Sequence, residues 1–265
     1  MASVTIPFSY LENYAQTVHD LDAINQSLLA DALAATDLND KRAVASVMRA
    51  VCQTSNEQAQ ELATAFYRGL SLMQTGKDMT KRVKSGWDET ATDVAVSAIL
   101  RDTEGDPEGM ASQLSQRLSF EINRASKRGV YRAGQADGRQ VRYARVPVGA
   151  ETCAWCIMTA GLGFWYMTEE SASHSHGGCD CVIVAEVVER PKTGEYRDVR
   201  IEGYDSAAYR EMYQRANALR ANGDLPQGML DHIAGMHDLR EMQGRPYRDD
   251  TNGTLYVMRQ MYGLK

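Results

Sequence analysis

Residues 174–188 read HSHGGCDCVIVAEVV, so a loop rich in cysteine and histidine runs directly into an apolar, strand-like segment. Upstream, residues 152–157 read TCAWCI. Four of the five cysteines and two of the five histidines of the chain thus lie between Cys153 and Cys181. Such crowding in a chain otherwise poor in both residue types indicates one local site. Metal binding, disulfide formation and catalysis are the chemistries to be weighed.

The spacing of the cysteines favours a metal. A C-x-x-C pair lets two thiolates converge on one ion from a tight turn, as in structural zinc sites. In the H-x-x-C-x-C arrangement that follows, cysteines two residues apart on a strand point the same way. Five candidates compete for the four positions of one structural zinc ion: Cys153, Cys156 and Cys179 first, then His176 and Cys181 for the last position, with His174 as an outsider.

Other interpretations of the cysteines stay open at this stage. The cysteines can be small buried apolar side chains without a metal, or they can form disulfides. A redox C-x-x-C is disfavoured, because that motif normally belongs to a βαβ unit. A catalytic zinc would need an open coordination position and a general base, for which Glu169 or Glu170 are the nearest carboxylates in the sequence.

The composition excludes several classes of protein. The 265 residues are 43% hydrophobic and 24% charged, which is typical of a globular chain. A net charge of -6 argues against indiscriminate nucleic-acid binding by the whole surface. No apolar run is long enough to span a membrane, and the N-terminus lacks the features of a signal peptide. We therefore expect a protein made in a reducing cytoplasm, where thiols persist.

The pattern of apolar residues predicts a mainly α, α+β fold in three parts. The first is an elongated helical bundle over residues 1–135, the second a small β-rich, zinc-stapled module over 136–203, and the third a helical extension over 204–265. Apolar residues at helical spacing support the bundle, including Leu11, Tyr14, Val18, Leu21, Leu28 and Ala32 on the first helix. The expected strands are 140–148, 163–167 and 181–188, with a hairpin over 190–201.

The motifs together resemble the phage Mu F-like minor head protein family. The similarity lies in RVPVGAETCAWCIMTAGLGFWY followed by HSHGGCDCVIV, within residues 145–184, although Gly177 stands where many members have a proline. The resemblance implies a structural, non-enzymatic role in head assembly and in DNA packaging or ejection. It also implies the phage portal protein as a partner, with the major capsid protein as a second one, and a location in the virion head near the portal.

A basic segment precedes the cysteines. Residues 123–145 carry seven basic side chains against the single Asp137. Interleaved tyrosines make the segment a candidate for contact with DNA, and the alternatives are docking to an acidic protein surface or ion pairing within the chain. The candidate binding residues are Arg124, Lys127, Arg128, Arg132, Arg139, Arg142 and Arg145.

Two rival functions are kept. The first is an enzyme, with toxin-like or nuclease-like activity in residues 190–265, where Asp231, His232 and His237 would be examined first. The second is a zinc-ribbon adaptor unrelated to phage. Cys52 lies on an apolar helical stripe and is expected to be a buried core thiol.

Overall fold

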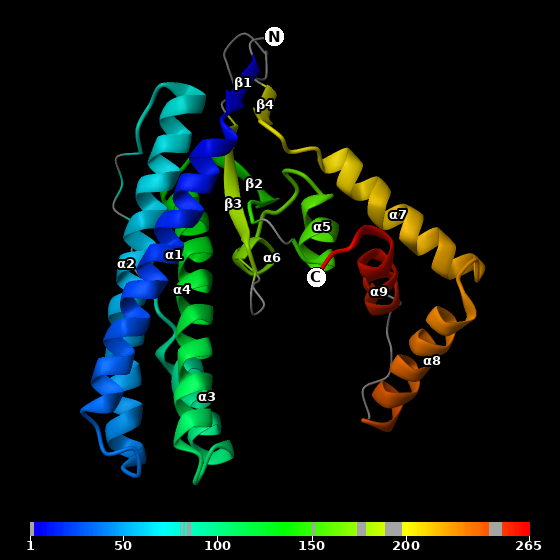
Figure 1. Cartoon of the computed structure of the whole chain (residues 1–265). Coiled ribbons are helices and arrows are strands. Elements are labelled where there is room, and N and C mark those ends of the chain that lie inside the picture. The colour runs from blue at the N-terminus through cyan, green and yellow to red at the C-terminus, as the bar shows by residue number, and fades with distance from the viewer. Residues whose placement is uncertain are drawn as a thin grey trace.

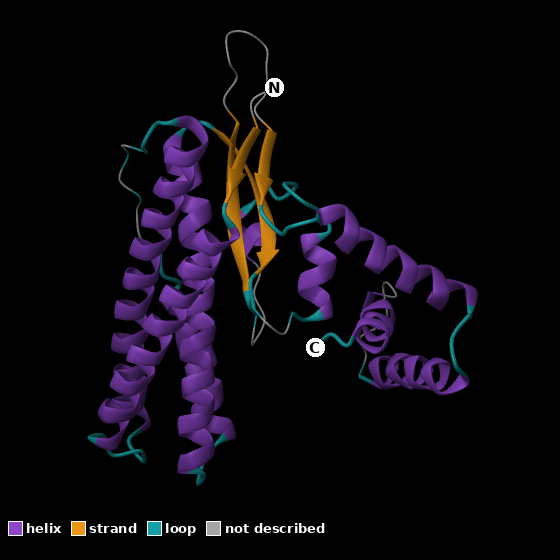
Figure 2. Ribbon diagram, turned by 45° about the horizontal axis from the view of Figure 1, so that its top comes forward, coloured by secondary structure: helices purple, strands orange, loops and turns teal. Residues whose placement is uncertain are grey.

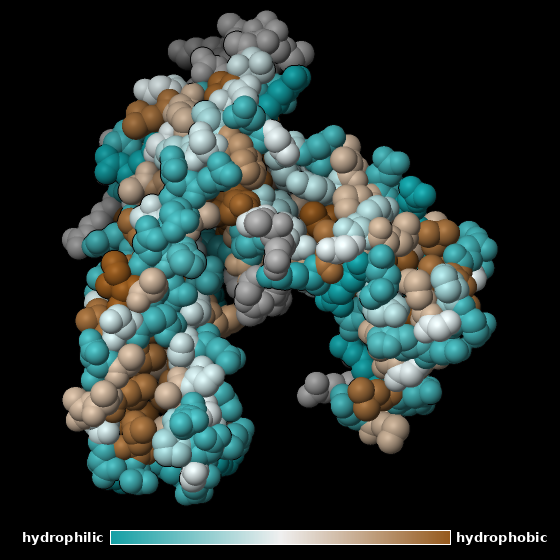
Figure 3. All heavy atoms as spheres, viewed as in Figure 1, coloured by the Kyte–Doolittle hydropathy of each residue, from teal (hydrophilic) through white to brown (hydrophobic). Residues whose placement is uncertain are grey.

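The computed structural model describes residues 3–79, 81, 83, 86–149, 152–173, 179–188, 198–243 and 251–265. It confirms the predicted class, a mainly helical α+β fold with a small β module. Long helices form one limb of the molecule, the strands lie beside them, and the C-terminal helices form a second limb (Figure 1). The space-filling view shows the two limbs separated by a deep hollow (Figure 3).

The first limb is a bundle of long helices whose ends are set by local sequence signals. Its members are α1 (Phe8–Ala34), α2 (Lys41–Thr75), α3 (Glu89–Asp102) and α4 (Pro107–Asp137). The side chains of Asp40, Asp88 and Asp106 accept backbone N–H bonds at the starts of α2, α3 and α4. Glycines in the left-handed conformation, Gly76 and Gly138, follow the ends of α2 and α4.

The core-facing stripe of α1 differs from the predicted one. Leu11, Tyr14 and Val18 are buried as expected, but Leu28 is 51% exposed. The buried positions of the second half are Asn25, Leu29 and Leu33 instead. The Asn25 amide donates hydrogen bonds to the Leu21 carbonyl and to the Gln58 side chain, and these bonds let a polar residue occupy the core.

Two strand pairs make up the β module. Strand β2 (Gln140–Pro147) pairs antiparallel with β3 (Cys181–Val188). The sequence predicted a strand in each of these two segments. Strand β1 (Ser3–Ile6) pairs in parallel with β4 (Asp198–Ile201), although residues 1–135 were expected to form a helical bundle. Figure 2 shows these strands grouped between the bundle and the C-terminal helices. Residues 190–197 of the predicted hairpin lie outside the described part of the chain.

The predicted strand over 163–167 was wrong. Tyr166 alone forms a bridge, to Tyr143 of β2. Gly163 has a φ of 64°, and the Trp165 N–H donates to the Gly163 carbonyl, so the chain turns there instead of extending. Two short helices, α5 (Ala154–Ala160) and α6 (Glu169–Ser173), flank this turn.

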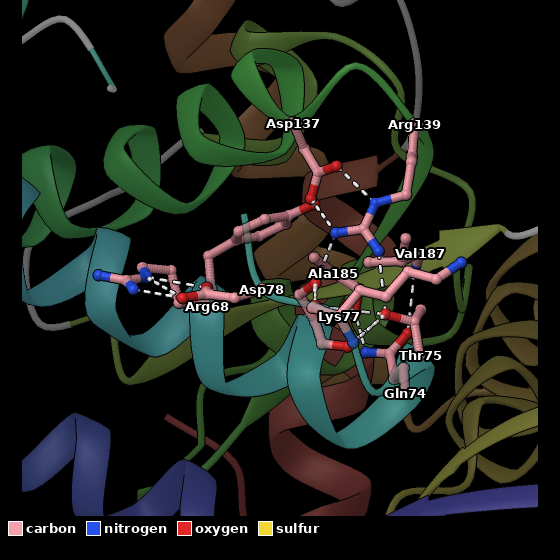
Figure 4. A network of polar contacts seen from close by, with 11 residues as sticks. Arg68, Gln74, Thr75, Lys77, Asp78, Asp137, Arg139, Ala185 and Val187 are labelled. Atoms are coloured by element: carbon pink, nitrogen blue, oxygen red, sulfur yellow. Dashed lines mark hydrogen bonds and ion pairs between the residues drawn. The ribbon is translucent and has the colours of Figure 1, made fainter. Parts of the chain in front are cut away.

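Side chains of α2 fasten the bundle to the module, as Figure 4 shows. The Gln74 amide donates to the Ala185 carbonyl and accepts from the Val187 N–H, at 2.7 and 2.8 Å. Arg139, just before β2, donates to the Ser71 and Thr75 hydroxyls and pairs with Asp137. These bonds fix the position of the strands, and therefore of the cysteines at their ends, relative to the bundle.

The C-terminal limb has an apolar core of its own. It comprises α7 (Ser206–Asn222), α8 (Gln227–Met242) and α9 (Thr251–Tyr262). Ala216, Ile233, Leu255 and Met258 from these helices pack with Ile157 of α5. The division of the chain after residues 135 and 203 stays a prediction, and contacts cross both lines, since β1 pairs with β4 and α5 packs against α7.

Candidate metal centre

Two separate segments bring the clustered cysteines together. Cys153 is the N-cap of α5, where its sulfur accepts the Cys156 backbone N–H at 3.3 Å. Cys181 begins β3 and stands opposite Pro147 of β2, and Cys179 precedes it by two residues. The capped helix start and the strand start meet, so the C-x-x-C and C-x-C pairs face one another across the end of the β2–β3 pair.

The geometry of the sulfurs fits a metal ion with thiolate ligands. The sulfur atoms of Cys156, Cys179 and Cys181 are buried and lie within 4.8 Å of one another. Tetrahedral coordination with Zn–S bonds of about 2.3 Å places sulfurs about 3.8 Å apart. The Cys156 and Cys179 sulfurs are 3.7 Å apart. Cys153, partly buried, packs against these three. The cluster can therefore hold a metal, and which metal it holds is a matter for proposal.

None of the five cysteines, all of which lie in the described part of the chain, forms a disulfide, and Cys52 does not belong to the cluster. Cys52 is completely buried in the bundle core, as the sequence predicted. Burial, followed by the nearby Glu121 carboxylate, raises the pKa of the Cys52 thiol to about 12. This cysteine is thus a protonated apolar side chain at ordinary pH.

The clustered thiols also favour the protonated state when no cation is bound. Hydrogen bonds of Cys156 with the thiols of Cys153, Cys179 and Cys181, and then burial, raise the pKa of Cys156 far above its usual value. A bound metal displaces such protons, because thiolates rather than thiols are metal ligands. Metal binding by this cluster would release protons and convert buried thiols to thiolates.

Two basic side chains contact the cluster from the bundle side. The Lys127 ammonium of α4 donates to the Cys179 sulfur at 3.0 Å, and the Arg145 guanidinium of β2 lies 3.7 Å from the same sulfur. Lys127 is 3% exposed and Arg145 is 1% exposed. Both residues belong to the basic segment 123–145, whose charge pattern predicted contact with DNA or a partner, because a charge pattern does not record burial.

The remaining members of the basic segment pair mostly with carboxylates of the protein itself. Arg128 and Arg132 both pair with Glu169, Arg139 with Asp137, and Arg142 with Glu186. Arg124 is partly buried on α4, and its charge adds to the effect of burial in lowering the pKa of Arg128. This arrangement matches the alternative of ion pairing within the chain, while a contact with DNA or the portal stays a prediction.

The remaining candidate ligands are histidines. His174 and His176 fall in residues 174–178, outside the described residues.

A cavity of about 440 Å³ between α1, α4 and the start of β3 is lined by Cys179 and Cys181, which gives an ion an approach to the cluster. Glu169 is occupied by its two arginines.

The residues named for an enzyme lie on α8. Asp231 accepts a hydrogen bond from Gln227, and His232 stacks on Tyr256 with ring centroids 4.2 Å apart. Among the described residues, Cys156, Cys179 and Cys181 form the cluster of histidine, cysteine or acidic side chains that could hold a metal ion. Asp231, His232 and His237 are not part of it.

A helical bundle, a strand module with a buried thiol cluster and a helical limb docked on α5 define a mainly α, α+β protein with a candidate metal centre. Within this class the chain belongs to the VG15 protein family, a family of phage and viral gene products, which matches residues 6–216. No curated protein and no solved structure is significantly similar to the chain. Along the described part of the chain, no helix has the length and apolarity needed to cross a membrane.

Proposed function

We propose that this protein is a structural minor head protein of a tailed phage, in which the thiol cluster holds one structural zinc ion. The observation that carries the proposal is the place of the cluster. Its cysteines come from α5 and β3, and its basic contacts come from α4 and β2. One ion there would join the bundle, the module and the C-terminal limb into a single body.

The donor set supports zinc and a structural role. Clustered cysteine sulfurs are soft ligands that select zinc over magnesium or calcium. Structural zinc sites are closed and use four protein ligands, whereas catalytic sites keep one position open for water. Cys156, Cys179 and Cys181 are 0%, 6% and 4% exposed, which suits a closed site. Metal binding can contribute on the order of 10 kcal/mol to the folding of such a module.

The location in the virion is part of the same proposal. Membership of a phage and viral gene family supports a virion component, and the resemblance to Mu F-like proteins supplies the portal as partner. The protein would be made in the host cytoplasm and incorporated into the head interior close to the portal. Its role would be in head assembly and in the packaging or ejection of DNA, without enzymatic activity.

Metal content tests the metal centre. Protein purified without added zinc should carry about one zinc per chain by elemental mass spectrometry, as expected for one tetrahedral site. Cys156→Ser should lose the metal and lower the unfolding temperature. Cys52→Ser is the matched control, because Cys52 is equally buried but lies in the bundle core. A wild-type protein without metal would refute the zinc proposal.

Composition of the virion tests the biological role. Mass spectrometry of purified heads should detect the protein in few copies, and it should co-purify with the portal protein from infected cells. Removal of residues 204–265 should alter head assembly. It should not reduce any hydrolytic activity, because none is expected in the full-length protein. A protein present in infected cells but absent from heads would contradict the minor head assignment.

A further inference from the structure

Lys127 and Arg145 bring two positive charges to one sulfur atom. They come from different elements, α4 and β2, and both direct a donor at Cys179. Arg145 is among the largest fully buried side chains of the described residues, and its second terminal nitrogen donates to the Ala172 carbonyl at 3.4 Å. The Lys127 stem lies in the packed face of α4 beside the buried Ser126. Both cations are buried, at 3% and 1% exposure.

Buried cations next to a cysteine sulfur indicate the charge of that sulfur when a metal is bound. Removing an ammonium or guanidinium group from water costs several kcal/mol unless an opposite charge lies close by. A neutral thiol offers little compensation, whereas a thiolate accepts charge-assisted hydrogen bonds. The two donors at Cys179 therefore fit a metal–thiolate cluster with a net negative charge better than a cluster of neutral thiols.

We infer that the metal is held by four thiolates, those of Cys153, Cys156, Cys179 and Cys181, and that Lys127 and Arg145 balance the charge of this centre. A divalent ion with four thiolates carries two negative charges, which the two cations match. This inference rests on the proposed metal centre and deepens it. It assigns the fourth ligand to a cysteine rather than to His176.

The contacts among the sulfurs support the same assignment. The Cys156 and Cys179 sulfurs are 3.7 Å apart, and Cys181 and the partly buried Cys153 pack in the same cluster. Replacing one thiolate by a neutral imidazole would leave a single negative charge against two buried cations. Asp180, the residue between Cys179 and Cys181, is partly buried. Its carboxylate accepts a hydrogen bond from the Thr152 hydroxyl.

Lys127 is then a positioning residue for the metal centre. Its hydrogen bond orients the Cys179 thiolate and lowers the energy of its charged form. Groups that contact metal ligands in this way typically change metal affinity by about 10- to 100-fold. Because Lys127 belongs to α4, the same bond ties metal occupancy to the helical bundle.

X-ray absorption at the zinc edge of the wild-type protein tests the ligand set directly. Four sulfur neighbours at about 2.3 Å are expected, whereas a histidine ligand would add a nitrogen at about 2.0–2.1 Å. His176→Ala should leave the spectrum and the zinc content unchanged. A nitrogen neighbour that disappears in His176→Ala would overturn the four-thiolate assignment while leaving the proposed metal centre intact. A wild-type protein without zinc would overturn both.

Competition with a zinc chelator tests the role of Lys127. Lys127→Met, which keeps the length of the side chain and removes the charge, should lower zinc affinity by about 10-fold or more. Lys127→Arg should restore much of that loss. Arg49→Met is the matched control, because Arg49 pairs with Asp93 in an exposed position on α2. Equal zinc affinity of wild type and folded Lys127→Met, with the bundle helicity retained, would overturn the charge-balancing role.

Discussion

The side-chain amide of Gln74 on α2 bonds the backbone of Val187 on β3, in the way that a neighbouring strand would. Its carboxamide oxygen accepts the Val187 N–H at 2.8 Å, while its nitrogen donates to the Ala185 carbonyl at 2.7 Å. Residues 185 and 187 present their backbone groups on the same edge, so one amide satisfies both (Figure 4). An edge strand with exposed groups is prone to pair with other chains, and here a helix side chain closes that edge.

Removal of this amide should destabilise the protein. Gln74→Met keeps the length of the side chain but leaves two buried backbone groups without their partner, at a cost of about 2–3 kcal/mol. Equilibrium urea unfolding provides the measurement. Gln53→Met, on the exposed side of the same helix where Gln53 bonds only Glu57, should change stability by less than about 0.5 kcal/mol. Equal effects of the two substitutions would contradict the role of Gln74.

The close contact between α2 and α4 depends on Gly129. A Cβ atom added there would lie 2.5 Å from the Ala63 Cβ and 3.1 Å from the Gln60 Cα. Gly129→Ala should therefore push the two helices apart and cost about 1–3 kcal/mol, despite the better helix propensity of alanine. Thermal unfolding followed by circular dichroism measures the effect.

Gly235 of α8 is the matched control for that substitution. It is exposed within a helix, and nothing lies within 4 Å of an added Cβ. Gly235→Ala should stabilise its helix by about 0.5–1 kcal/mol, because alanine restricts the unfolded chain. Opposite signs for the two glycines are expected. Stabilisation by both would show that α2 and α4 are not in tight contact at residue 129.

The strands that the sequence predicted correctly are those with a local signal. Residues 181–188 are rich in β-branched residues, and residues 140–147 carry valine and tyrosine and end at a proline, so a strand was expected in each segment. The strand Ser3–Ile6 has four residues and pairs with residues 198–201, far along the chain, with Ser3 opposite Asp198. No local pattern records a partner so distant in sequence, so this strand was missed.

The candidate site was predictable to a similar extent. Ligand spacing pointed to Cys153, Cys156, Cys179 and Cys181, which the fold brings together. The contribution of Lys127 and Arg145 was not predictable, because their positive charges are typical of a surface segment. Only the packing of α4 and β2 against the cysteines shows that these two side chains point inward.

Asp137 should make stability depend on acid pH. Burial opposes its ionisation, but hydrogen bonds from Arg139 and Tyr67 outweigh burial and hold the pKa of the carboxyl below its usual value. The unfolded carboxyl has a pKa of about 3.9, so the unfolded state binds the proton first as the pH falls. The stabilisation is present above that value and is lost as the pH falls through the folded pKa. In Asp137→Asn, the change in urea midpoint between pH 6 and pH 3 should be smaller than in wild type.

Glu186 should act in the opposite direction. Burial raises the pKa of its carboxyl, although the ion pair with Arg142 works against the increase. The folded state therefore binds a proton more readily than the unfolded state, and this residue adds stability as the pH falls from about 6 toward 4. Glu186→Gln should lose more stability on acidification than wild type. A change of the same sign in Asp137→Asn and Glu186→Gln would contradict the opposed environments of the two carboxyls.

Helix α5 should transmit loss of the metal to the C-terminal limb. Cys156 on this helix belongs to the thiol cluster, and Ile157, the next residue, is buried against α7–α9. Seven residues are too few for a stable isolated helix, so α5 depends on contacts on both of its sides. Chelation should therefore increase hydrogen exchange in α5, α7 and α9, while the half of the bundle around Cys52 keeps its protection.

Ile157→Ala separates the two sides of α5. This substitution removes apolar contacts to the C-terminal core and leaves Cys156 in place, so α7 and α9 should exchange faster while zinc is retained. Hydrogen exchange with mass spectrometry and elemental analysis on the same sample measure both properties. If chelation abolished the protection of α5 alone and left α7 and α9 unchanged, the C-terminal limb would be held by contacts other than α5. The two experiments together give the direction of the coupling. Loss of zinc should increase hydrogen exchange in the C-terminal limb, whereas increased exchange in the limb should not release zinc.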